Sequence, residues 1–184
     1  MRAMTVMPRE SRDWTVHDLD LLPDDGLQYE LLDGSLLVSP APTTRHQRAV
    51  ARLYLLLAAA CPDDLELFFA PLDWRPDIRT SLQPDLLVVR KEDVELANIT
   101  RPLVLAVEIL SPSTRRKDAV YKRSKYEDSG VAGYWIVDPE GPSITALDLV
   151  DGRYVKVGEG SGDTPVTLRN PFPVTVTPSA LVDS

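Results

Sequence analysis

The sequence predicts an α/β fold in which a mixed β-sheet forms the core and helices flank it. Segments typical of strands alternate along the chain with two segments typical of helices, residues 46–60 and 115–129. The run from Leu103 to Leu110 is almost continuously apolar, which is typical of a central strand covered on both faces. Asp33 and Gly34 separate two further apolar runs and predict a tight hairpin.

Proline, glycine and capping residues mark where these elements begin and end. A short helix is expected over residues 15–22, opened by a threonine and stopped by a proline. The helix over residues 46–60 is rich in Ala, Leu and Arg, which favour helices, and a proline ends it. The charged helix over residues 115–129 ends at Gly130. Strands are expected over residues 28–32, 35–39, 65–70, 85–90, 103–110, 133–138, 144–149 and 153–157.

The chain of 184 residues has the length of one domain. We expect a flexible N-terminal arm over residues 1–13, which hold no apolar core of their own, and a single domain over residues 14–184. The longest run of small apolar residues, 53–61, has about half the length of a membrane span. Cys61 is the lone cysteine, so no intramolecular disulfide forms and a cytoplasmic location is expected.

The charge balance narrows the class of partner. The chain has 20 Lys and Arg against 28 Asp and Glu, a formal net charge of −8, which excludes a general polyanion binder of the histone type. Six of the cations nevertheless gather in one predicted helix, and within residues 115–125 they are opposed only by Asp118: Arg115, Arg116, Lys117, Lys122, Arg123 and Lys125. Such a run usually forms a solvated helix face. Here it follows directly after the most apolar strand, so its side chains can fold back over the end of that strand.

Two carboxylates stand on strands that are otherwise apolar. Glu108 lies within the run 103–110, where an unpaired charge costs several kcal/mol unless it meets a cation, a hydrogen-bond network or a proton. Asp85 follows Pro84 at the start of another apolar strand. If these strands are neighbours, the two anions repel each other unless a divalent cation lies between them. Oxygen ligands without cysteine favour Mg²⁺ or Mn²⁺.

Glu30 is a third acid with apolar flanks, on the first strand of the predicted hairpin. A structural explanation is open for each of the three acids. Glu108 fits a buried salt bridge or a strand end that faces water, and Asp85 fits a cap at the start of a strand. Glu30 fits the wet face of a hairpin.

These residues resemble the PD-(D/E)XK nuclease superfamily, in which Pro-Asp is followed by Glu-x-Lys; here Pro84-Asp85 precedes Glu108-x-Leu110. Some members place the missing lysine on the following helix, and Lys122 or Lys125 would take that part here, since both lie on one helix face. More specifically, the order of motifs is similar to the Uma-two family of putative restriction endonucleases. The matching segments are Tyr29–Gly34, Ser39–Pro42, His46–Gln47, Gln83–Leu86, Val107–Thr114, Asp118 with Lys122 and Tyr126, and Gly130–Pro139.

The resemblance implies a restriction-endonuclease-like fold and a metal site. We expect Asp85, Glu108 and a main-chain carbonyl near Ile109, with Glu30 in support, to hold one Mg²⁺ or Mn²⁺. Lys122 would orient a water molecule for attack on a phosphodiester bond of DNA.

Lys125 remains a competitor for the part of Lys122 in this mechanism. Arg115, Arg116 and Lys117 would position the phosphate backbone of the nucleic acid without reading bases. For His46 and Gln47, capping or packing is favoured over a contact to phosphate or to the metal shell.

Two other functions compete with a DNA endonuclease. The first is a catalytically silent binding module, which Leu110 and the net charge favour. The second is a phosphodiesterase acting on RNA or another phosphorylated substrate. A homodimer would supply the two sites that a double-strand cut requires.

Overall fold

The computed structural model describes residues 5–7, 13–23, 25–39, 41–111 and 117–183, with only the backbone described at residues 5–7 and 117–119. Its largest element is a six-stranded sheet with the strand order β11-β10-β9-β8-β7-β4. Neighbouring strands are antiparallel except for β8 and β9, so the sheet is mixed, as predicted. The strands are β4 (Leu65–Phe69), β7 (Leu86–Arg90), β8 (Leu105–Ile109), β9 (Gly133–Asp138), β10 (Ser143–Val150) and β11 (Arg153–Ser161).

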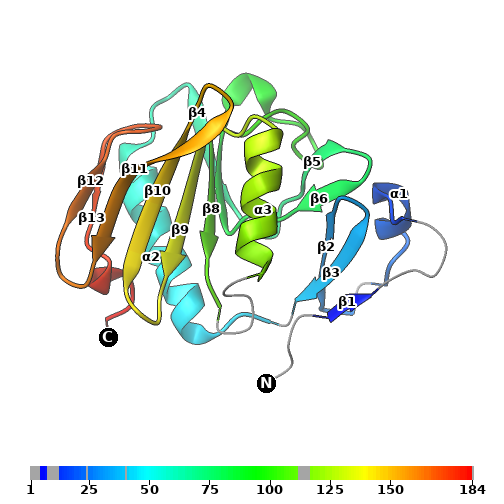
Figure 1. The fold of residues 1–184 in the computed structure, drawn as a ribbon, viewed down its shortest axis with the longest axis horizontal. Helices are drawn as coiled ribbons and strands as arrows, with labels where there is room; N and C mark the ends of the chain where they lie inside the picture. Colours follow the sequence, from blue (N-terminus) through cyan, green and yellow to red (C-terminus); the bar gives the residue numbers. More distant parts are fainter. Residues whose placement is uncertain (1–4, 8–12, 24, 40, 112–116, 184) are drawn as a thin grey trace.

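A helix covers each face of this sheet (Figure 1). On one face, α2 (Thr44–Ala60) packs through Leu53 and Leu57 into the same apolar cluster as Val107 of β8. On the other face, α3 (Lys117–Asp128) contributes Tyr126 to a second cluster, which includes Ala106. Consecutive residues of β8 thus point to opposite faces, and both faces are buried. The helix α3 is also the crossover that parallel pairing of β8 and β9 requires.

A smaller five-stranded sheet, with the order β1-β3-β2-β6-β5, lies on the far side of α3 (Figure 1). A short helix, α1 (Val16–Leu19), packs on this sheet through Leu19, which shares an apolar cluster with residues of β2 and β3. The hairpin β2–β3 has the predicted bounds. The strands are β1 (Thr5–Met7), β2 (Gln28–Leu32), β3 (Ser35–Ser39), β5 (Trp74–Asp77) and β6 (Thr80–Leu82).

Residues 5–7 fall within the arm expected over residues 1–13, and they form β1, which pairs with β3 in an antiparallel register. Main-chain hydrogen bonds at the edge of a sheet need no apolar core in the added strand, which is why composition gave no sign of it.

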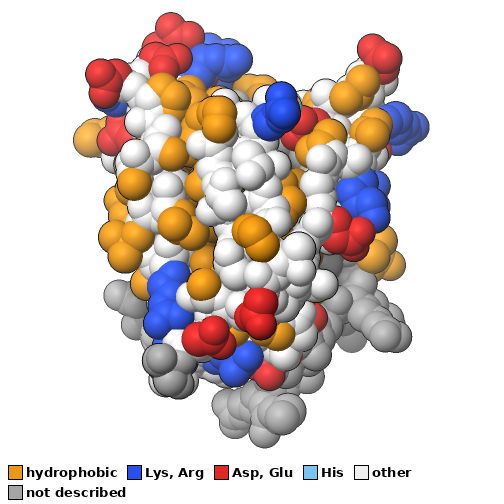
Figure 2. All heavy atoms as spheres, turned by 90° about the vertical axis from the view of Figure 1, so that its left-hand side faces the viewer, with side chains coloured by type: hydrophobic (Ala, Val, Ile, Leu, Met, Phe, Trp, Pro, Cys, Tyr) orange, Lys and Arg blue, Asp and Glu red, His pale blue; other side chains and the backbone are white. Residues whose placement is uncertain are grey.

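The C-terminal part of the chain adds a two-stranded hairpin, β12 (Val166–Leu168) and β13 (Val174–Val176), beside β11. Short 3₁₀ helices occur at η1 (Lys91–Asp93) and η2 (Ser179–Leu181). Figure 2 shows hydrophobic and uncharged side chains over much of this side of the molecule, with charged side chains of both signs mainly around the margin. None of the helices in the described residues is long and apolar enough to cross a membrane.

The turn between β2 and β3 depends on Gly34, whose φ is +85°. A Cβ atom there would lie 2.8 Å from Cβ of Asp13, so both the backbone conformation and the space disfavour a side chain. We predict that Gly34→Ala lowers the free energy of unfolding by about 1–3 kcal/mol in urea denaturation. The control Gly141→Ala, at an open position, should change it by less than about 0.5 kcal/mol. Equal losses in both variants would contradict this account of the turn.

Candidate active site

The two acids singled out on core strands lie beside each other. Leu86 of β7 pairs with Val107 of β8, so Asp85 and Glu108 are the next positions outward on the two antiparallel strands. In that register they share one face of the sheet. Asp85 also accepts a hydrogen bond through Oδ2 from the main-chain N–H of Ile109, at 2.7 Å. The carboxylates therefore meet at one end of the sheet, next to the main chain of β8.

Glu108 is surrounded by donors from α3. Nζ of Lys122 lies 3.2 Å from its Oε1 and 3.3 Å from its Oε2, and the hydroxyl of Tyr126 donates to Oε1 at 2.7 Å. Burial raises the pKa of Glu108 to about 7, and the negative charges of Asp85 and Glu30 act in the same direction. The positive charge of Lys122 opposes this shift without cancelling it.

Lys122 links Glu108 to the third acid, which comes from the smaller sheet. Its Nζ donates to Oε1 of Glu30 at 2.9 Å, and the same oxygen accepts from the main-chain N–H of Gln83 at 2.8 Å. Lys122 and Glu30 are 8% and 3% exposed. Burial alone would lower the pKa of Lys122, but the charges of Glu108 and Glu30 outweigh it, so the pKa is raised and the side chain stays protonated.

Of the two lysines left open by the sequence, the structure brings only Lys122 to the carboxylates. Lys125 turns to the smaller sheet, where its Nζ lies 2.7 Å from Oδ1 of Asp33 and 2.8 Å from Oδ2 of Asp77. These acids stand in the β2–β3 turn and at the end of β5. Lys125 is therefore a tie between α3 and the smaller sheet.

The cluster contains two further residues, His46, for which the sequence favoured another role, and Tyr126, which the sequence did not indicate as a partner of Glu108. His46 was expected to cap or pack, but its Nε2 lies 3.3 Å from Oδ1 of Asp85. Burial lowers the pKa of His46, but hydrogen bonds to Asp85 and to the main chain of Ile109, with the charges of Asp85 and Glu108, together raise it by more. Tyr126 was not identified as a partner of Glu108. Its position four residues after Lys122, on the same helix face, was the available signal.

Four further residues were predicted to take part in the site, and the structure describes one of them in full. Arg115 and Arg116 lie outside the described residues, and the side chain of Lys117 does too. Ile109 lies at the end of β8, with its N–H on Asp85. Its main-chain carbonyl is the oxygen that the sequence analysis assigned to a metal.

The donor chemistry of the cluster fits a hard divalent cation. Asp85, Glu108 and Glu30 are oxygen donors, and with all three ionised their negative charge exceeds the positive charge of Lys122 and a protonated His46. This excess of buried negative charge is what an added cation would balance. In the described part of the chain, no three His, Cys, Asp or Glu side chains are already arranged to hold a metal ion. Since Lys122 occupies both oxygens of Glu108, a metal there would compete with it.

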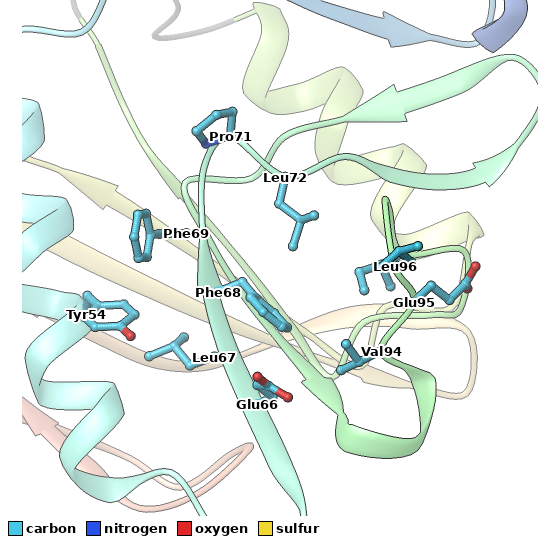
Figure 3. A pocket seen from close by; sticks show the side chains of 11 residues that line it. Tyr54, Glu66, Leu67, Phe68, Phe69, Pro71, Leu72, Val94, Glu95 and Leu96 are labelled. Carbon is cyan, nitrogen blue, oxygen red and sulfur yellow. The ribbon is translucent and has the colours of Figure 1, made fainter. Parts of the chain in front are cut away.

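An open hollow elsewhere on the surface is separate from this cluster (Figure 3). It lies along the edge strand β4 and is mostly apolar. Its lining residues are Tyr54, Glu66, Leu67, Phe68, Phe69, Pro71, Leu72, Val94, Glu95, Leu96 and Ile99. None of the three clustered acids lines it.

The raised pKa of Glu108 makes stability depend on pH. The folded chain binds this proton more tightly than the unfolded chain, whose carboxyl has its ordinary value of 4.5. The stabilising contribution is therefore complete below that value and is lost as pH rises through about 7. Glu108→Gln should remove this loss, so we predict a smaller decrease in its free energy of unfolding between about pH 5 and 8. Urea denaturation across that range measures it.

The control for this experiment is Glu66→Gln, which removes a carboxylate from β4, outside the cluster. It should keep the pH dependence of the wild type. If Glu108→Gln also keeps it, the titrating group is not Glu108.

Comparison with known proteins identifies the fold and the family of the chain. The structure is similar to the crystal structure of a putative nuclease belonging to DUF820 from Anabaena variabilis ATCC 29413, with a TM-score of 0.65 and 17% sequence identity. The alignment covers 82% of this chain and 85% of that chain, and confirms the predicted nuclease-like α/β fold. No protein in the curated set matches the sequence. Residues 16–180 match the family described as Uma2, putative restriction endonuclease, and the chain therefore belongs to that family.

Proposed function

We propose that this protein is a divalent-metal-dependent endonuclease that hydrolyses phosphodiester bonds of DNA at the Asp85–Glu108–Lys122 cluster. One observation carries the proposal: two carboxylates at the ends of neighbouring core strands share a buried site with a protonated lysine. Family membership and the fold of the structural neighbour support a nuclease. The metal and the DNA substrate are part of the proposal.

The metal would be held by the carboxylates of Asp85 and Glu108 and the main-chain carbonyl of Ile109, with Glu30 in support. When bound, Mg²⁺ or Mn²⁺ would supply Lewis-acid chemistry at a phosphate oxygen and lower the pKa of a bound water. The chain's own contribution is to fix these oxygens. Asp85 is held by the N–H of Ile109, and Glu108 by the hydroxyl of Tyr126.

Lys122 has an electrostatic part in the proposed reaction. Because its pKa is raised, it keeps its proton at neutral pH and cannot act as a general base. A buried ammonium stabilises negative charge that develops on phosphate oxygens and donates a hydrogen bond to the attacking water. Its contacts to Glu108 and Glu30 hold it in place for that purpose.

Cationic residues outside the cluster support a nucleic acid as the substrate. Arg115, Arg116 and Lys117 stand between Glu108 and Lys122 in the sequence, and we propose that they contact the phosphate backbone. Action on DNA inside the cell implies a cytoplasmic location. A double-strand cut by a chain with one such site implies a homodimer.

A catalytically silent binding module is the second candidate. It is favoured by the ion pairs themselves, since Lys122 already engages both oxygens of Glu108 and one of Glu30. In that case the cluster would only join α3 to the two sheets. Metal binding and cleavage distinguish the two functions.

Cleavage of plasmid DNA with Mn²⁺ tests the assigned residues. Asp85→Ala, Glu108→Ala and Lys122→Met should each lower the rate by at least about 100-fold, because each removes a group that acts on the reacting phosphate or on the metal. Lys125→Met is the matched control, since it removes an ammonium from the same helix face but from outside the cluster. Its rate should fall by less than about threefold.

In the cleavage assay, circular dichroism must show that each variant is folded. Full activity of a folded Glu108→Ala variant, or equal losses in Lys122→Met and Lys125→Met, would refute these roles.

Thermal unfolding with and without Mg²⁺ or Mn²⁺ tests the metal site separately. A ligand that binds only the folded chain stabilises it by about 2.7 kcal/mol at 100 times its dissociation constant, so the wild type should unfold at a higher temperature. Glu108→Ala and Asp85→Ala should lose this shift, and Lys125→Met should keep it. No shift at millimolar metal would favour the silent module.

A further inference from the structure

We propose that His46, at the start of α2, is a positioning residue that fixes the carboxylate of Asp85 for metal binding. This inference rests on the proposed function and extends it to a residue on the opposite side of the sheet. Nε2 of His46 lies 3.3 Å from Oδ1 of Asp85, while the other oxygen of Asp85 accepts from the N–H of Ile109 at 2.7 Å. Each oxygen thus has its own donor, one from a side chain and one from the main chain.

Two donors on different oxygens restrict the carboxylate in a way that neither does alone. The bond from Ile109 fixes one oxygen against β8, but leaves the plane of the carboxylate able to turn about that contact. The ring of His46 holds the second oxygen and so restricts this rotation. Carboxylates that bind metals are commonly held in this manner by groups behind them.

The start of α2 is anchored firmly enough to serve this purpose. The hydroxyl of Thr43 caps the helix by accepting from the N–H of His46 at 3.2 Å. Nε of Arg45 donates to the main-chain carbonyl of Pro139, which follows β9, at 2.7 Å. Further along α2, Leu53 and Leu57 are fully buried against the sheet. His46 therefore extends from a helix that is fixed both at its first turn and along its core face.

The burial of His46 argues against packing as its main role. The residue is 7% exposed, and its Nδ1 is buried with no hydrogen-bond partner among the described residues. A buried polar atom without a partner costs free energy, which an apolar side chain of similar size would avoid. What the imidazole provides in return is the contact of Nε2 with Asp85.

The test compares three variants of His46 by their affinity for Mn²⁺ in calorimetry. His46→Ala removes the ring, and His46→Asn keeps a short amide that cannot extend to the position of Nε2. His46→Gln restores an N–H donor at about that position. We expect the dissociation constant for Mn²⁺ to rise about tenfold in the Ala and Asn variants and less than about threefold in the Gln variant. In plasmid cleavage, kcat should follow the same order while KM for DNA stays at the wild-type value.

A second measurement needs no metal. In ¹H–¹⁵N NMR of the metal-free protein, the amide of Ile109 reports on its bond to Asp85, and Asp85→Asn gives the signal expected when the carboxylate is lost. The Ile109 signal should move in His46→Ala and His46→Asn and stay near its wild-type position in His46→Gln. Urea denaturation shows whether each variant is folded. If His46→Ala does not fold, His46→Asn takes its place in the comparison.

The outcomes separate this inference from the proposed function. Wild-type Mn²⁺ affinity and an unmoved Ile109 signal in His46→Ala would overturn it, and so would equal impairment of folded His46→Gln and His46→Ala. If the wild type neither binds Mn²⁺ nor cleaves DNA, the proposed function fails. The NMR signal of Ile109 then still decides whether His46 orients Asp85.

Discussion

The buried ammonium of Lys122 is the interaction on which the arrangement of this protein depends. It contacts Glu108 of the six-stranded sheet and Glu30 of the five-stranded sheet, and it comes from the helix between them. Removing one partner of a buried ion pair leaves an uncompensated charge, at a cost of about 3–5 kcal/mol. Here the loss of Lys122 would leave two such charges, one on each sheet. The ammonium adds a polar contact to the apolar cluster in which Trp74 of the smaller sheet, Tyr126 of α3 and Ala106 of β8 pack together. The pair Lys125–Asp33 adds a more exposed tie beside it.

The same cluster sets a requirement on any phosphate that approaches it. A chain with a net charge of −8 that also gathers Asp85, Glu108 and Glu30 at one place repels a polyanion. Lys122 offsets only part of this charge, since its one ammonium contacts both Glu108 and Glu30. The nuclease chemistry that we propose at this place would therefore use an added cation, and oxygen donors of this kind are those that a hard cation prefers.

Local sequence signals predicted some of these features and not others, for physical reasons. The turn Asp33-Gly34 gives the hairpin its bounds because both residues have positive φ, a conformation that few residues adopt. The run 103–110 identified β8 because burial on both faces leaves a plain apolar pattern. By contrast, β5, β6, β12 and β13 have three or four residues each, too few for a period to be seen. The strand β1 forms by pairing with an edge that only the folded chain provides.

The choice between Lys122 and Lys125 shows the same limit at the site. They lie three residues apart on one helix face, so helix periodicity treats them alike. What separates them is the position of the smaller sheet, which brings Glu30 to Lys122. The same sheet brings Asp33 and Asp77 to Lys125. Leu110 stands where the pattern of the superfamily that the sequence resembles has a lysine on the strand itself. A lysine at position 110 would extend from the end of β8, whereas Lys122 on α3 contacts an acid of each sheet. In this chain the ammonium that the proposed chemistry uses also contacts an acid of each sheet, so a substitution at Lys122 alters both at once.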